Sequence, residues 1–194
     1  MSYWNKALSD AGEEISSYRA NYLEELTELY QQKLSPRLGS LSEGEVGFSY
    51  RRGWRESATL CETLEQGVER ERVVGHTLSG PHEADMAIKS GDGVAKNVLS
   101  RGQAKLLSVG LYLSQLSHLY RKTGKKGIVL FDDMFSELDH QNSLTILEYL
   151  IDSGHQVFAT TTEGDVSLLN ERDLEMFHVE HGGVSTVVKQ TITA

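Results

Sequence analysis

Two adjacent carboxylates follow a short, fully apolar run in the sequence. The run is Ile128–Phe131, and Asp132 and Asp133 come directly after it. Ligands of open α/β sheets gather at the carboxyl ends of strands, so these acids are candidates for a ligand site. One acid could hold Mg²⁺, directly or through water, while the other orients or deprotonates an attacking water. Acidic turns also follow many ordinary strands, and the pair alone leaves both interpretations open.

A second candidate site lies in Leu99–Gln103, at the start of a predicted helix. A helix N-terminus carries unpaired N–H groups and the positive end of the helix dipole, and both favour a phosphate. Ser100 could add a hydroxyl donor, and Gly102 lets the backbone approach closely because it lacks a Cβ. An ordinary N-cap followed by a surface glycine is the alternative for these residues.

Two further polar segments have ordinary explanations beside functional ones. Ser136–Asp139 follows the acidic pair and could simply cap the next helix through Asp139. Arg51–Arg55 contains three arginines around Trp54, which suits either contact with DNA phosphates or a solvated surface. The seven histidines show no metal-binding spacing with cysteine, so we do not expect a zinc site.

Hydrophobic spacing and turn signals predict the elements that would position these residues. Helices are predicted over residues 4–34, 56–71, 100–124 and 141–152, and strands over 46–50, 85–89, 94–98, 127–131, 156–160, 176–179 and 184–188. The strand over 127–131 is expected to be buried on both faces. Strand–helix–strand order with short connections implies parallel strands in an α/β layer. We expect a mostly helical arm segment with a short strand over residues 1–72, and an α/β lobe over 73–194.

Composition excludes several classes of protein. The 194 residues carry a formal net charge of −9, which rules out a polycation that coats nucleic acid but not a local basic patch. A single cysteine excludes an internal disulfide and favours a reducing compartment. The apolar runs are far shorter than the roughly 20 residues of a membrane span, and the N-terminal residues do not resemble a signal peptide. We therefore expect a cytoplasmic protein without a membrane partner.

The order of these motifs is more specific than any one of them. A Leu-Ser-x-Gly-Gln helix start, an apolar strand with two acids and then Ser-x-Leu-Asp resembles the signature, Walker B and D-loop of the C-terminal lobe of an ABC-type ATPase. Gly80–Asp85, Ser100–Leu107 and Phe131–Asp139 together resemble the RecF family, bacterial DNA replication and repair proteins related to the SMC ATPases. The resemblance covers about residues 4–179 and includes Arg52–Trp54.

The resemblance implies a fold and a function. The fold is the C-terminal lobe of an ABC-type ATPase, a partly parallel sheet flanked by helices, with the helical arm segment before it. RecF-like proteins bind ATP with Mg²⁺, dimerise on ATP, bind DNA at gaps or as duplex, and work with RecO and RecR to load RecA. They are cytoplasmic weak ATPases of DNA repair, replication, recombination and the SOS response.

Roles for individual residues follow from the resemblance as well. Asp132 occupies the Walker B position that holds Mg²⁺, and Asp133 occupies the position of a catalytic glutamate with a shorter side chain. Four consecutive residues are expected to contact the γ-phosphate of a nucleotide bound by the opposite subunit: Ser100, Arg101, Gly102 and Gln103. Asp139 is expected to meet its counterpart across the dimer. Threonines at 160–162 replace the switch histidine of many ABC enzymes, so that contact should be weaker or different.

The chain has no Gly-x-x-x-x-Gly-Lys-Ser/Thr motif. Without that loop the phosphates of ATP lack their cradle, so we expect a fragment of the family that is inactive alone and holds no cofactor tightly. Two alternatives stay open. The chain could be a module that binds DNA or a partner without nucleotide chemistry, or an unrelated Mg²⁺-dependent phosphohydrolase that uses Asp132, Asp133 and Asp139.

Overall fold

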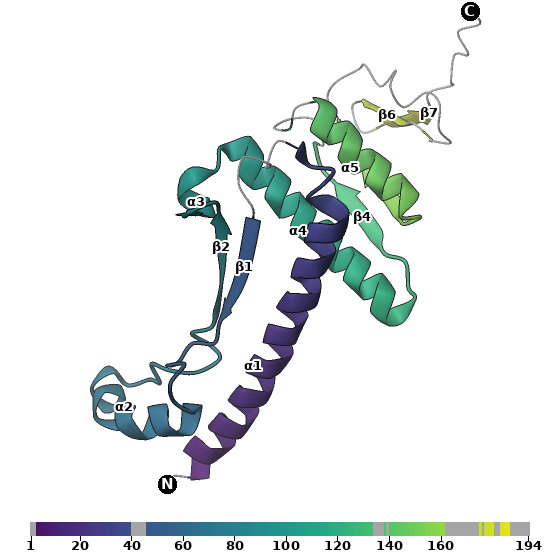
Figure 1. Ribbon diagram of the computed structural model, residues 1–194. Coiled ribbons are helices and arrows are strands. Elements are labelled where there is room, and N and C mark those ends of the chain that lie inside the picture. The colour runs from purple at the N-terminus through teal and green to yellow at the C-terminus, as the bar shows by residue number, and fades with distance from the viewer. Residues whose placement is uncertain are drawn as a thin grey trace, which may run out of the picture.

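The computed structural model describes residues 3–39, 46–133, 138, 140–161, 175, 177–180 and 183–186. Its longest element is α1 (Tyr3–Leu29), which continues into a π-helical turn, η1 (Tyr30–Leu34), and confirms the helix predicted over 4–34. In Figure 1, α2 (Leu60–Val74) lies beside the N-terminal end of α1, and α4 (Arg101–Thr123) crosses its C-terminal part. Within the described residues, neither these helices nor any other is long and apolar enough to cross a membrane.

An antiparallel sheet lies along α1 (Figure 1) and contains β1 (Val46–Arg51), β2 (Asp85–Ser90) and β3 (Gly93–Val94) in that order. The strand predicted over 94–98 is wrong, because the chain leaves β3 at once and forms a short helix, α3 (Ala95–Val98). This helical turn buries Ala95 and folds the Val98 side chain back over the bare backbone of Gly93. Burial thus overrides the strand preference of valine.

Helix α2 begins later than its hydrophobic spacing predicts. The Thr59 side chain accepts a hydrogen bond from the Glu62 backbone N–H at 3.2 Å, and the Glu62 carboxylate accepts one from the Thr59 backbone N–H at 2.8 Å. This reciprocal pair is a capping box, which satisfies two N–H groups and fixes the first turn after Thr59. The predicted start at residue 56 is therefore wrong by one turn.

The α/β layer follows α4 and contains β4 (Ile128–Phe131), α5 (His140–Asp152) and β5 (Gln156–Ala159). β4 and β5 pair in parallel, with Phe131 opposite Ala159, as the strand–helix–strand order predicts. A terminal hairpin of β6 (Phe177–Glu180) and β7 (Gly183–Thr186) confirms the last two predicted strands. The chain thus has the predicted α/β character with a mainly helical N-terminal part.

The main hydrophobic core lies where η1, α4 and α5 meet. Tyr30, Leu106 and Leu150 are among its fully buried members, and Val129 and Phe131 of β4 pack against it. Ile128 and Leu130 alternate with them and are 66% and 78% exposed. The prediction that β4 is buried on both faces is therefore wrong, because the described core covers only one side of the β4–β5 pair.

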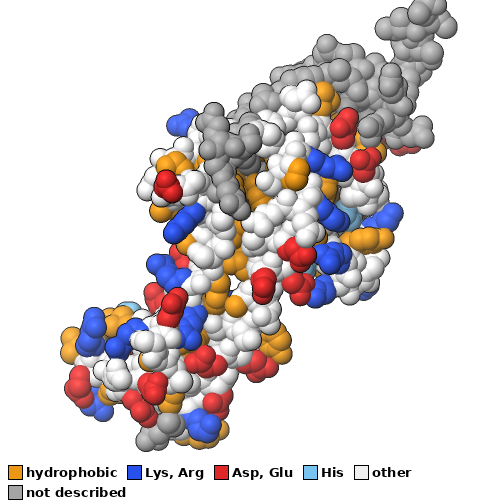
Figure 2. All heavy atoms as spheres, in the orientation of Figure 1, with side chains coloured by type: hydrophobic (Ala, Val, Ile, Leu, Met, Phe, Trp, Pro, Cys, Tyr) orange, Lys and Arg blue, Asp and Glu red, His pale blue; other side chains and the backbone are white. Residues whose placement is uncertain are grey.

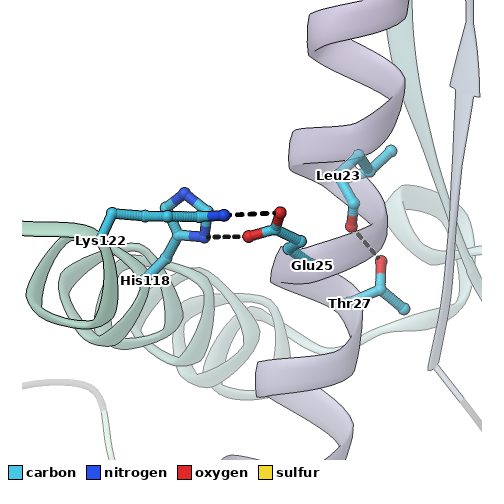
Figure 3. Close-up of polar contacts among 5 residues, drawn as sticks. All are labelled: Leu23, Glu25, Thr27, His118 and Lys122. Carbon is cyan, nitrogen blue, oxygen red and sulfur yellow. Dashed lines mark hydrogen bonds and ion pairs between the residues drawn. The ribbon is translucent and has the colours of Figure 1, made fainter.

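A cluster of polar side chains connects α1 to α4 (Figure 3). The Glu25 carboxylate accepts a hydrogen bond from Lys122 Nζ at 2.8 Å and lies 3.3 Å from His118 Nδ1. His118 also meets the Tyr22 ring edge-on, with 4.9 Å between ring centroids. The hydrogen bond from Lys122 is the main cause that holds the pKa of Glu25 below its ordinary value of 4.5. The cluster therefore favours the ionised form of Glu25 in the folded protein.

We expect Glu25→Gln to lower Tm slightly at neutral pH and to leave Tm unchanged at low pH. The folded-state pKa of Glu25 is depressed, so its stabilisation is complete above the unfolded pKa and disappears as the pH falls through the folded pKa. The effect is small because both side chains of the pair are about half exposed. Thermal unfolding from pH 7 to pH 3 measures it.

Glu28→Gln is the matched control, because the Glu28 carboxylate accepts its hydrogen bond from the neutral Gln32 amide on the same helical segment. We expect the difference in Tm between this variant and the unchanged chain to vary less with pH than for Glu25→Gln. An equal pH dependence in the two variants would show that Lys122 and His118 do not stabilise the Glu25 carboxylate.

Candidate functional site

The structure brings the acidic pair after β4 against the end of β5. Thr160 follows β5 directly, and its backbone N–H donates to the Phe131 carbonyl at 2.9 Å, which extends the parallel ladder by one bond. The Thr160 hydroxyl donates to Asp132 Oδ1 at 2.7 Å and accepts from the Asp133 backbone N–H at 2.9 Å. The two predicted site residues thus share one hydrogen-bonding partner on the neighbouring strand.

The backbone of Asp133 adopts an uncommon conformation. Its φ is +48°, and it is the one non-glycine residue with positive φ among the described residues. Aspartate and asparagine enter this left-handed region more readily than most side chains. Asp133 thus departs from the extended backbone of β4, which ends at Phe131.

The acidic pair offers carboxylate oxygens of the kind that bind Mg²⁺ in nucleotide sites. Carboxylate oxygens are preferred Mg²⁺ ligands, and nucleotide-bound Mg²⁺ needs one or two of them beside the phosphates and water. Among the residues that the structure describes, no group of three His, Cys, Asp or Glu side chains could hold a metal ion by itself. An all-protein metal cage is therefore not formed by this part of the chain, whereas one carboxylate that completes a Mg·nucleotide complex suits Asp132.

The predicted signature segment forms the first turn of α4. Ser100 is the N-cap: its hydroxyl accepts from the Gln103 N–H at 3.3 Å, while its own N–H donates to Gln103 Oε1 at 2.9 Å. Arg101 is exposed, and Gly102 is partly exposed beside it. The predicted N-cap is confirmed, and the Gln103 side chain has a structural contact that the sequence did not indicate.

This turn and the acidic pair lie on separate elements of the chain. The first turn of α4 follows α3 and the antiparallel sheet in the chain, whereas Asp132 and Asp133 follow β4, which comes after the C-terminal end of α4. Asp139, which is predicted to belong to a D-loop, lies outside the described residues, although its neighbour Leu138 is described and buried in the main core. In the described part of the chain, the two candidate segments are therefore held by different elements.

Two of the arginines around Trp54, Arg51 and Arg52, make contacts within the protein. The Arg52 guanidinium lies 5.0 Å from the Trp54 ring centroid and donates to the Ala58 carbonyl at 3.0 Å. Arg51 pairs with Asp85 at 3.3 Å across the β1–β2 pair. Figure 2 shows acidic and basic side chains intermingled on the coloured part of this face. These contacts favour a structural role for Arg51 and Arg52.

Thr160 is a candidate functional residue whose contact with the two acids was not predicted from the sequence. The sequence has threonines at 160–162, where the resemblance implies a switch histidine, and it predicts only a weaker or different contact there. The structure shows that the first of them contacts the acidic pair instead. The available signal was its position directly after the strand that pairs with β4.

Comparison with known proteins finds relatives over nearly the whole chain. The DNA replication and repair protein RecF of Vibrio atlanticus is 38% identical over 185 residues, which are 95% of this chain and 51% of that protein. RecF of Aliivibrio salmonicida is 35% identical over 186 residues, with the same shares of the two chains. No family model matches the chain. The chain thus spans about half the length of the curated relatives it matches.

Solved structures give the same result for the fold. A structure of the recombination mediator protein RecF with ATP, from the RecFOR pathway, superimposes with a TM-score of 0.73 at 28% identity. The match covers 95% of this chain and 49% of that one. RecF with ATPγS gives a TM-score of 0.69 at 26% identity over 93% of this chain. The predicted resemblance is confirmed: over nearly all of its length, this chain is a homologue of about half of a RecF protein, and the match supports its interpretation as the C-terminal portion.

Proposed function

We propose that this chain supplies the signature, Walker B and D-loop half of a RecF-like DNA repair ATPase. The observation that carries the proposal is the superposition of this chain on RecF with ATP. In this chain the acidic pair directly follows β4, which pairs in parallel with β5. Asp132 holds Mg²⁺, and Asp133 orients the attacking water. Ser100–Gln103 and Asp139 contact the nucleotide and the partner across an ATP-dependent homodimer. In this proposal residues 1–72 form the arm segment and 73–194 the lobe.

The first turn of α4 is suited to the γ-phosphate of a nucleotide on the opposite subunit. Its backbone N–H groups and the positive end of a long helix favour an anion, and Gly102 keeps the approach open. The exposed guanidinium of Arg101 adds a cation at the same end. Bound Mg·ATP would supply the phosphoryl group and the metal that neutralises its charge, while these residues orient it.

DNA at gaps, RecO and RecR are the proposed partners, with RecA loading as the outcome. The names of the relatives support DNA replication and repair, and the RecFOR pathway, to which the solved RecF structures belong, supports RecO and RecR. We propose that the protein acts on DNA in the cytoplasm, where the bacterial chromosome lies.

A chimera tests the proposal. In this RecF chimera, the present chain replaces the matched half of Vibrio atlanticus RecF, which is 38% identical to it. We expect the chimera to bind gapped DNA more tightly with Mg·ATP than with Mg·ADP in fluorescence anisotropy. Binding that is equally tight with either nucleotide would favour a DNA-binding module without nucleotide chemistry, and a chimera that folds but binds neither ATP nor DNA would contradict the proposal.

The chain by itself is expected to show no measurable ATPase activity and to bind ATP weakly. It has no P-loop motif, and the first turn of α4 offers only a few N–H groups on one side of a γ-phosphate. Isothermal titration calorimetry of the isolated chain with Mg·ATP measures this. Micromolar affinity would show that the chain contains a phosphate cradle of its own, and turnover of a generic phosphodiester with Mg²⁺ would favour the unrelated hydrolase.

A further inference from the structure

A single hydroxyl group joins the two candidate catalytic acids. Thr160 Oγ1 lies 2.7 Å from Asp132 Oδ1 and 2.9 Å from the backbone nitrogen of Asp133. Both contacts cross from the end of β5 to the end of β4, between residues 28 and 27 positions apart in the sequence. Thr160 therefore fixes the position of both acids relative to the sheet.

The chemistry of the groups sets the direction of both hydrogen bonds. An ionised carboxylate can only accept and a backbone N–H can only donate, so the hydroxyl proton points at Asp132 while an oxygen lone pair faces Asp133. The hydroxyl thus has one orientation instead of three rotamers. Consecutive hydrogen bonds also polarise one another, so the N–H of Asp133 strengthens the bond to Asp132.

The backbone holds the hydroxyl in place. The Thr160 N–H donates to the Phe131 carbonyl, so the residue is anchored to the last position of β4, directly before Asp132. Threonine is β-branched, and its χ1 rotates little in an extended segment. The anchor, the stiff side chain and the two bonds of the hydroxyl determine the direction of the Asp132 carboxylate and support the positive φ of Asp133.

We propose that Thr160 is a positioning residue for Mg²⁺ at this site: it holds Asp132 by Oδ1 so that Oδ2 faces the metal, and it holds the turn that aims Asp133. The proposal rests on the proposed function, because Asp132 must be the metal position. Partners of metal ligands that orient them typically change metal affinity or activity by about 10–100-fold when they are removed. In this proposal Thr160, the first of the three threonines, acts through the two acids.

The simplest alternative is that Thr160 only stabilises the ends of the strands. Thr160→Val separates the two, because valine keeps the β-branched shape and the backbone bond to Phe131 but has no hydroxyl. Thr160→Ser keeps the hydroxyl and is the rescue variant. Thr145→Val is the matched control, since the Thr145 hydroxyl donates to the Gln141 carbonyl on α5, away from the acids.

The first measurement uses the present chain without nucleotide. Amide hydrogen exchange of Asp133, followed by NMR, is expected to be at least several-fold faster in Thr160→Val than in the unchanged chain and in Thr160→Ser. The exchange of amides in α4 is expected to stay unchanged in all variants. Equal protection of the Asp133 amide in Thr160→Val would show that the hydroxyl does not hold this turn and would overturn the proposal.

The second measurement uses the RecF chimera and titrates Mg²⁺ at a fixed concentration of a fluorescent ATP analogue. In Thr160→Val we expect the Mg²⁺ concentration for half-maximal binding to rise about 10-fold or more. Binding of the analogue in EDTA should be unchanged, and Thr160→Ser and Thr145→Val should resemble the unchanged chimera. Loss of thermal stability without a shift of the Mg²⁺ midpoint would assign Thr160 a structural role only.

The two proposals fail in different ways in this titration. If the unchanged chimera folds but shows no Mg²⁺-dependent nucleotide binding, the proposed function is wrong, and the metal role of Thr160 is wrong with it. If the unchanged chimera binds with Mg²⁺ and Thr160→Val has the same midpoint, only the role of Thr160 is wrong.

Discussion

Asp132→Asn in the RecF chimera is expected to weaken Mg²⁺-dependent nucleotide binding and to abolish turnover, whereas Asp133→Asn is expected to spare binding and to slow hydrolysis by about 10²–10⁴-fold. Asp132 Oδ1 is held by Thr160 at 2.7 Å, so its carboxylate has a fixed direction, as a metal ligand requires. Asparagine at 132 removes the negative charge that Mg²⁺ needs.

Asp133→Asn replaces a carboxylate by an amide of nearly the same shape. Asparagine tolerates the positive φ of position 133 as well as aspartate does, so Asp133→Asn leaves the turn intact. It removes the carboxylate that aligns water and should therefore leave the ATP-bound dimer intact or longer-lived. Nucleotide affinity, dimer lifetime and turnover are measured for both variants, with Asp92→Asn in the β2–β3 turn as a surface control.

The losses of Mg·ATP binding and of turnover in the two variants decide which acid holds the metal and which orients the water. If Asp133→Asn loses Mg·ATP binding while Asp132→Asn keeps it, the two roles are reversed. Equal loss of binding in both variants would mean that the acids share the metal. Unchanged turnover in both would exclude this end of the sheet from the chemistry.

Ser100→Arg in the chimera is expected to retain nucleotide binding but to lose ATP-driven dimerisation and to hydrolyse ATP at least about 10²-fold more slowly. The N-cap of α4 is where the γ-phosphate of the opposite subunit should lie, and arginine would fill that space. Sedimentation velocity with and without Mg·ATP measures dimerisation, and filter binding measures nucleotide affinity.

Ser100→Ala distinguishes the effect of the bulky arginine side chain from the effect of losing the N-cap hydrogen bond. Both variants lose the hydrogen bond from the Gln103 N–H to the Ser100 hydroxyl, at a cost of about 1 kcal/mol in stability. Only arginine blocks the approach to the helix end, so Ser100→Ala should still dimerise with ATP. Dimerisation of Ser100→Arg with ATP would place Ser100 outside the composite site.

Most helices and strands could be predicted because their signals are local. The N-cap at Ser100 and the stop at Gly124 depend on side-chain capping and a positive φ within one turn, and both are seen. The helix start at Thr59 was missed because a capping box overrides hydrophobic spacing. The strand predicted over 94–98 failed because burial of Ala95 in the main core is a long-range effect.

The sequence draws attention to the two acids of the candidate site but does not predict their contacts. Asp132 and Asp133 stand out in the sequence because they end an apolar run. The bridge through Thr160 joins positions 28 residues apart and depends on the register of two parallel strands, which a single sequence does not fix. The exposed face of β4 was missed for a similar reason, since an apolar run does not show which side the chain itself covers.

A mixing experiment tests most directly whether Ser100–Gln103 completes the nucleotide site of the opposite subunit. One chimera carries Ser100→Arg, and the other carries alanine in place of the P-loop lysine that the proposed function assigns to its Vibrio atlanticus half. A mixed dimer contains one intact site, made from the P-loop of the first chain and the Ser100 of the second. We predict that the mixture hydrolyses ATP clearly faster than the sum of the two proteins measured alone, and a rate equal to that sum would contradict the account.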